Sequence, residues 1–153
     1  MIPLVFVALM IGREPALPDT SRCVAAVRFL REVQHLIAVV EPDTIDDWRT
    51  GRHLPGCRVT AAGTSDVGVA REAVRFYERL RAAGWKRTPD PRDAPNESSL
   101  RFRWESADCL FNVYDGARLG TDAEFTVNDA VVPKLGQVRY QVFTMCVERL
   151  PAA

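Results

Sequence analysis

Apolar residues recur at every third or fourth position in two stretches of the sequence, which is the spacing of an amphipathic helix. The first stretch covers residues 23–40 and stops before Pro42, which cannot continue a helix. The second covers residues 69–83 and follows Thr64, Ser65 and Asp66, whose side chains are common helix N-caps. Charged residues lie on the other side of the second stretch. The pattern therefore predicts two helices that each bury one face.

Apolar and polar side chains alternate in the second half of the sequence, which is typical of strands. Leu100, Phe102 and Trp104 alternate with arginines, and the alternation returns in residues 109–114, so residues 100–114 are expected to form a hairpin. Further strands are predicted at residues 57–61, 85–88, 124–127 and 137–147. Residues 41–56, which contain several Asp, Gly and Pro residues, are expected to form a connector.

The 153 residues contain no internal repeat, and their number fits one domain. Helices and strands in the predicted order are typical of an α+β fold. We expect two helices packed on one face of a four- or five-stranded, mostly antiparallel sheet. This single domain is expected to span residues 18–153.

Residues 2–11 form a continuous apolar run that is followed by a polar segment with Gly12 and Pro15. This run is too short for a membrane-spanning helix, which needs about 20 residues, and it matches the apolar region of a secretory signal peptide. Residues 1–17 are therefore predicted to be a signal peptide, and the mature chain is expected to have no membrane span. Because no Lys or Arg precedes the run and no Ala-x-Ala site follows it, a buried strand of a cytosolic domain is the alternative.

Four cysteines are widely spaced and include no C-x-x-C pair, so a structural zinc site is not expected. In an exported chain they predict two disulfides, whereas in a cytosolic chain they would be small buried residues. Cys109 and Cys146 are expected to share a buried side of the sheet, which makes them the preferred pair. Cys23 and Cys57 would then join the first helix to the first strand. Four cysteines allow three connectivities, and the spacing alone does not decide between them.

Lys and Arg together number 20, as do Asp and Glu, so the chain has no bulk attraction for nucleic acid, and no nucleic-acid partner is expected. The sequence contains no calcium-loop spacing and no glycine-rich phosphate loop, so we expect no metal and no cofactor. His35 and His53 are the only histidines, and neither has a neighbour that suggests a catalytic arrangement. These absences favour a protein that is not an enzyme.

Charge is distributed unevenly along the chain. Residues 71–103 contain nine basic and five acidic residues, whereas residues 104–132 contain one basic and six acidic ones. If Arg101, Arg103 and Arg139 project from the outer face of the sheet beside Tyr114 and Gln141, that face could bind an acidic protein partner or a small anionic ligand. The alternative is a solvated face on which the arginine stems cover apolar surface.

The sequence therefore predicts a small exported binding or accessory protein, periplasmic or secreted, for example of the inhibitor or immunity type. One alternative is a small-ligand-binding protein or a hydrolase-like enzyme with a pocket near residues 43–56. Its candidate residues would be Asp46, Asp47, Trp48 and His53. The other alternative is a cytosolic domain with reduced cysteines.

Overall fold

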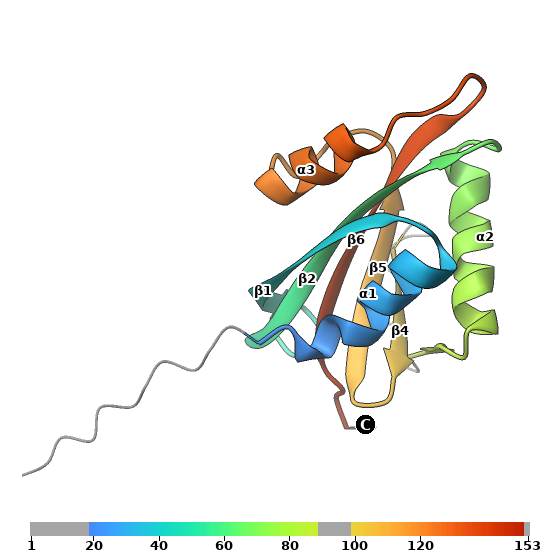
Figure 1. Ribbon diagram of the computed structural model, residues 1–153. Helices are drawn as coiled ribbons and strands as arrows, with labels where there is room; N and C mark the ends of the chain where they lie inside the picture. Colours follow the sequence, from blue (N-terminus) through green and yellow to red (C-terminus); the bar gives the residue numbers. More distant parts are fainter. Residues whose placement is uncertain (1–18, 89–98, 152–153) are drawn as a thin grey trace, which may run out of the picture.

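The computed structural model describes residues 19–88 and 99–151, so the predicted signal peptide lies outside the described residues (Figure 1). Within these residues six strands form one sheet in the order β1-β2-β6-β5-β4-β3, and every pairing is antiparallel. The strands are β1 (Ile37–Asp47), β2 (Arg52–Ser65), β3 (Lys86–Arg87), β4 (Ser99–Trp104), β5 (Ala107–Tyr114) and β6 (Val138–Glu148). The helices are α1 (Val24–Arg28), α2 (Val69–Ala82) and α3 (Asp122–Ala130), and the short helices η1 (Ser21–Cys23) and η2 (Phe29–Val33) flank α1.

The predicted α+β class with an antiparallel sheet is confirmed, but the described residues contain more elements than expected. Helices α1 and α2 cover one face of the sheet, where Phe76, Phe102 and Phe111 are fully buried in the main core (Figure 1). Helix α3 covers part of the opposite face, where Val127 packs against Ala62 of β2. The sheet is therefore the middle layer of the domain.

The first predicted helix is wrong beyond Val33. His35 has a φ of 55°, a left-handed conformation that interrupts the helical path. The following segment is rich in β-branched residues and pairs with β2, with Ile37 opposite Ala62. The apolar residues at positions 23–40 keep one helical spacing throughout. Those up to Val33 nevertheless lie in helices, and those from Ile37 onward lie in strand β1.

The predicted connector at residues 41–56 is also wrong, because most of it belongs to strands β1 and β2. The two strands form a hairpin whose turn, residues 48–51, ends at Gly51 with a φ of 63°. Pro42 and Pro55 lie within these strands. Because Pro42 is on an edge strand, its missing N–H removes no interior ladder bond.

The strand predicted at residues 124–127 is helical and lies in α3. Thr121 begins this helix, since its hydroxyl accepts a hydrogen bond from the Glu124 N–H at 3.2 Å. A Thr followed three residues later by a Glu is the capping-box pattern, which outweighs the short alternation of side chains. The bounds of helix α2, the β4–β5 hairpin and the long strand β6 match the predictions closely. The predicted N-caps of α2 are wrong, because Thr64 and Ser65 end β2 and the helix begins after Gly68 without a side-chain cap.

Candidate functional site

The sheet register places all five predicted binding residues on the face that α3 partly covers. Arg101 lies opposite Leu110 and Arg103 opposite Asp108, while Tyr114 lies opposite Gln141. Arg139 is on the same side of β6 as Gln141, two residues away. The five residues thus share one face of the sheet, as the alternation predicted. Their side-chain contacts nevertheless divide them into two groups.

Arg101 and Arg103 belong to a group of charged side chains that we call the ionic cluster. Its members are Asp47, Arg49, Arg101, Arg103 and Asp108. The Arg103 Nε lies 2.6 Å from Asp108 Oδ1, and the Arg49 Nη1 lies 3.0 Å from Asp108 Oδ2. Arg101 is only 2% exposed, and its Nη2 lies 3.7 Å from Asp47 Oδ1. These arginines therefore bond within the protein, and Arg101 does not project into solvent.

The end of β1 and the hairpin turn supply two members of the ionic cluster and the tryptophan that covers it. Asp47 precedes Trp48 in the chain and Arg49 follows it. The centre of the Trp48 ring lies 5.0 Å from the Cζ of the Arg101 guanidinium. Burial alone would raise the pKa of the Asp108 carboxyl, but hydrogen bonds from Arg103 and Arg49 outweigh it and hold that pKa below its usual value. The cluster is consequently a set of mutually paired charges, three guanidinium groups and two carboxylates, that fixes the hairpin turn to the sheet.

The other three predicted residues are tied to α3 and the loop that follows it. Gln141 donates from Nε2 to the Asn128 side chain at 2.6 Å, and Arg139 donates to the Val131 carbonyl at 2.6 Å. Tyr114 donates its hydroxyl proton to Glu124 Oε1 at 2.9 Å. These side chains hold α3 on the sheet.

Glu124 is a fully buried carboxylate in a stretch whose acidic composition alone did not predict its burial. Besides the Tyr114 hydroxyl, it accepts the backbone N–H groups of Arg118, Leu119 and Gly120 at 2.8–3.0 Å. Burial alone would raise the pKa of Glu124, but these hydrogen bonds lower it by more than burial raises it, so the pKa of this carboxyl lies below its usual value. These four partners lie within ten residues of Glu124 in the chain. The capping-box pattern marks the start of α3 at Thr121 but does not predict them.

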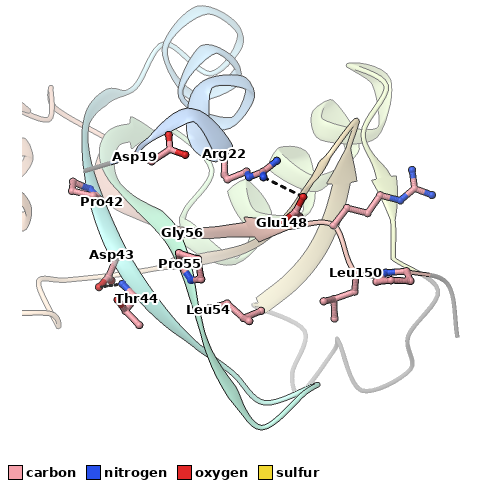
Figure 2. Close-up of a pocket in the computed structure, with 12 residues that line it drawn as sticks. Asp19, Arg22, Pro42, Asp43, Thr44, Leu54, Pro55, Gly56, Glu148 and Leu150 are labelled. Atoms are coloured by element: carbon pink, nitrogen blue, oxygen red, sulfur yellow. Dashed lines mark hydrogen bonds and ion pairs between the residues drawn. The ribbon is translucent and has the colours of Figure 1, made fainter. Parts of the chain in front are cut away.

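A pocket of about 990 Å³ lies where the start of η1, the middle of the β1–β2 hairpin and the end of β6 meet (Figure 2). Its lining residues are Asp19, Arg22, Pro42, Asp43, Thr44, Leu54, Pro55, Gly56, Glu148, Arg149, Leu150 and Pro151. These residues come from four separate parts of the chain. The pocket is a tertiary feature that no local sequence pattern marks.

The pocket combines apolar walls with charged groups at its rim. Pro42, Leu54 and Pro55 contribute apolar surface from the hairpin, and Leu150 contributes it from the residues after β6. Gly56 brings its backbone close to β6, because a Cβ atom there would collide with the Cys146 carbonyl oxygen. Any larger residue at position 56 would push β2 away from β6 and alter this wall.

Two of the rim carboxylates, Asp19 and Asp43, have few partners. The Asp19 carboxylate accepts the Ser21 N–H at 2.8 Å, and this hydrogen bond lowers the pKa of Asp19. Asp43 accepts the N–H of Thr44 at 2.8 Å and lies 3.6 Å from an Arg58 nitrogen. In contrast, Glu148 forms an ion pair with Arg22 at 3.2 Å (Figure 2). Both aspartates are therefore placed where a ligand could meet a negative charge.

The alternative site predicted near residues 43–56 overlaps this pocket in position but differs in its residues. Asp43, Thr44 and residues 54–56 line the pocket, whereas Asp46, Asp47, Trp48 and His53 do not. Asp47 is buried in the ionic cluster, and His53 is an exposed residue of β2 opposite Asp46. The pocket thus has no histidine among its lining residues.

The structure bonds Cys23 to Cys57 and Cys109 to Cys146, which is the pairing that the sequence favoured. All four side chains are fully buried. Among the described residues there is no group of His, Cys, Asp and Glu suited to a metal ion. The helices of residues 19–88 and 99–151 are all too short or too polar to cross a membrane.

Comparison with protein-family models, curated proteins and solved structures finds no match to this chain.

Proposed function

We propose that this chain is an exported binding protein whose ligand site is the pocket between η1, the β1–β2 hairpin and the end of β6. The carrying observation is the pocket itself, whose volume of about 990 Å³ is comparable to that of small-molecule sites. Apolar walls and a few charged groups are the usual composition of such sites. The chain offers no matching nucleophile and base in this pocket, so binding is favoured over catalysis.

The surroundings of the charged groups support the pocket as the binding site over the arginine face, the side of the sheet that carries Arg101, Arg103 and Arg139. The carboxylates of the ionic cluster accept bonds from arginines inside the protein, so a ligand would have to displace existing ion pairs. At the pocket, Asp19 is exposed and Asp43 is about one-third exposed, so both carboxylates can accept further hydrogen bonds. A ligand gains more where the protein charges are not already compensated.

The exposed edge of β1 does not favour a partner that adds a strand. Arg31 donates to the Ala38 carbonyl at 2.7 Å, and Pro42 has no N–H to offer. The N–H of Thr44 is bonded to the Asp43 carboxylate. A strand edge that is capped in this way resists pairing with another chain, so recognition by side chains in the pocket is the better-supported mode.

The pocket chemistry fits a ligand with an apolar body and a cationic end. Its lining contains three carboxylates, Asp19, Asp43 and Glu148, and two guanidinium groups, Arg22 and Arg149. Arg22 pairs with Glu148, and the nearby Arg58 is shared between Asp43 and Glu41, so the groups at and beside the rim carry more negative than positive charge. This ligand class differs from the anionic one predicted from the arginine face.

Two disulfides support a location outside the reducing cytosol. The apolar run at residues 2–11 agrees with that placement as a signal peptide. We therefore place the function in the periplasm or outside the cell.

The proposal is tested by titrating the ¹⁵N-labelled protein with phenethylamine and, separately, with phenylacetate. These probes share an aromatic body and carry opposite charges. We expect the amine to shift the backbone amide signals of Thr44, Gly56 and Leu150, and the carboxylate to shift them less. Asp43→Asn should weaken amine binding about two- to fivefold, the range expected of one exposed ion pair.

Asp66→Asn is the matched control, since Asp66 is an exposed aspartate that pairs with Arg75 away from the pocket lining. It should leave the amine titration unchanged. Shifts spread over the whole surface, or equal responses to the two probes, would contradict the proposed site.

A further inference from the structure

Three of the four cysteines lie side by side across three neighbouring strands. Cys146 of β6 is directly opposite Cys57 of β2 on one side and directly opposite Cys109 of β5 on the other. Cys23 comes from η1 and reaches this row through its bond to Cys57. All four side chains are fully buried, so the two disulfides form one contiguous group.

The sheet geometry lets Cys146 bond to either neighbour. The Cα atoms of Cys109 and Cys146 are 4.1 Å apart, which identifies the narrow type of antiparallel pair. A residue that forms a narrow pair on one side forms the wide pair on the other, with a Cα separation of about 5.5 Å. Disulfides span Cα separations of about 4.4–6.8 Å, so a bond between Cys57 and Cys146 needs little movement of the backbone.

Cys109 is also close to the segment that carries Cys23. Its sulfur lies 4.0 Å from the Arg22 carbonyl oxygen, and the Cys57 sulfur lies 3.7 Å from the Thr20 carbonyl oxygen. Both sulfurs therefore lie beneath η1. A second pairing, Cys57 with Cys146 and Cys23 with Cys109, would join the same four elements in other combinations, β2 to β6 and η1 to β5.

We propose that the four cysteines form a thiol–disulfide exchange unit that reacts with an external dithiol. In the first step the dithiol reduces the Cys23–Cys57 bond, becomes a disulfide itself and leaves two protein thiols. In the second step the Cys57 thiolate attacks the Cys146 sulfur, so that the Cys57–Cys146 bond forms and the Cys109–Cys146 bond breaks. Cys109 leaves as a thiolate and takes up the proton that Cys57 lost, so the second step changes no oxidation state.

The Cys23–Cys57 bond is the entry point because it is next to the pocket. Arg22 and Gly56, the chain neighbours of these two cysteines, both line the pocket. The three-residue helix η1 covers the bond, and Arg22 holds η1 in place through Glu148 and through the Ser106 hydroxyl, each at 3.2 Å. Local opening of η1 therefore admits the dithiol without unfolding of the sheet.

Reduction of the Cys23–Cys57 bond releases η1 from β2, and the second step keeps Cys57 from bonding to Cys23 again. In the rearranged form Cys57 is bonded within the sheet, while Cys23 and Cys109 are thiols. Segment 19–23, which carries Asp19 and Arg22 of the pocket lining, is then no longer joined to the sheet by a disulfide. The rearranged form is thus a second covalent state of the same domain.

The first test uses Cys23→Ser, which leaves Cys57 as a thiol beside the Cys109–Cys146 bond. The variant is equilibrated with a glutathione redox buffer, quenched with acid, alkylated, and mapped by peptide mass spectrometry. We expect the Cys57–Cys146 bond together with Cys109–Cys146, each at 10% or more of the variant, and no Cys57–Cys109 bond, because β6 separates these two residues. In denaturant the variant should instead form more of the Cys57–Cys109 bond than of the Cys57–Cys146 bond, since Cys57 is closer in the chain to Cys109 than to Cys146.

The second test uses the wild-type protein with limiting dithiothreitol, so that it does not depend on a variant that folds. Species with one disulfide are trapped by acid and mapped in the same way. Their pool should contain the Cys57–Cys146 bond. If the folded wild-type protein shows only the Cys23–Cys57 and Cys109–Cys146 bonds and the folded variant only Cys109–Cys146, the exchange unit is overturned. It is also overturned if the Cys57–Cys109 bond forms as readily as Cys57–Cys146.

Discussion

The β1–β2 hairpin places charged residues in two regions of the protein with opposite consequences. At its turn, Asp47 and Arg49 enter the ionic cluster, where carboxylates and guanidinium groups are buried and bonded to each other. In its middle, Asp43 lines the pocket rim and remains about one-third exposed. The same kinds of side chain therefore serve stability at one place and remain available to a ligand at the other.

The difference follows from the cost of removing charge from water. A buried carboxylate is tolerated only when its partners replace the lost hydration, as three nitrogens of Arg49 and Arg103 do around Asp108. A carboxylate at a rim keeps water as a partner and needs no such set. Removal of a charge should therefore be costly in the ionic cluster and nearly neutral at the pocket.

The largest effect is expected for Asp108→Asn. The substitution removes the negative charge that the buried Arg49 and the partly buried Arg103 share, and it leaves both guanidinium groups without compensation from that side chain. Breaking a buried ion pair in this way costs about 3–5 kcal/mol of unfolding free energy. Urea unfolding followed by circular dichroism at pH 7 measures the loss.

Asp66→Asn is the control, because Asp66 pairs with Arg75 on the surface at 3.4 Å. An exposed pair is worth about 0–1 kcal/mol. Equal losses for the two variants would mean that the ionic cluster is no better bonded than the surface pair.

A smaller loss is expected for Glu124→Gln, which tests the second buried carboxylate. Each oxygen of Glu124 accepts at least one backbone N–H, so the amide NH₂ of Gln would face a donor whichever way it is turned. The mismatch should cost about 1–3 kcal/mol of unfolding free energy. Asp122→Asn, in the same first turn of α3 but exposed, should change stability by less than about 0.5 kcal/mol.

Both buried carboxylates also predict how stability depends on pH. Asp108 and Glu124 have lower pKa values in the folded protein than the usual values of about 3.9 and 4.3 that they take when unfolded. Their contribution to the unfolding free energy is therefore complete above the pKa values of the unfolded chain. It is lost as the pH falls through the pKa values of the folded protein. A pKa lowered by one unit on folding corresponds to about 1.4 kcal/mol.

We thus expect the unfolding free energy of the wild-type protein to decrease below about pH 4. The decrease should be shallower in Asp108→Asn and in Glu124→Gln, because each variant lacks one of the titrating groups. Urea midpoints measured between pH 3 and pH 7 provide the comparison. Parallel curves for all three proteins would show that other groups govern the acid response.

The sequence predicted those parts of the fold in which one local pattern dominates. Helix α2 and the β4–β5 hairpin follow directly from periodicity, and the cysteines on the predicted buried sides indicated the observed disulfides. The prediction failed at His35, where a single left-handed residue divides one apolar spacing between a helix and a strand. It also failed at α3, where the capping residue Thr121 outweighs a short alternation.

The candidate site was harder to predict from the sequence than the fold, because residues that are distant in the chain form it. Segments 19–22, 42–44, 54–56 and 148–151 meet only after β1, β2 and β6 have paired. The arginine face was predicted from alternation, which gives the side of the strand correctly and says nothing about what lies above it. Only the folded hairpin turn shows that Arg101 is covered.

The smallest effect is expected for Asp43→Asn, and it defines the contrast between the two regions. Its carboxylate is about one-third exposed and lies 3.6 Å from an Arg58 nitrogen, while Arg58 keeps Glu41 as a closer partner at 3.0 Å. The unfolding free energy should therefore change by less than about 0.5 kcal/mol, measured in the same urea series. Because Asn retains an oxygen that accepts the Thr44 N–H, the local backbone should also be unchanged. A loss comparable to that of Asp108→Asn would show that the rim charge serves stability, and the pocket would then lose its distinction from the ionic cluster.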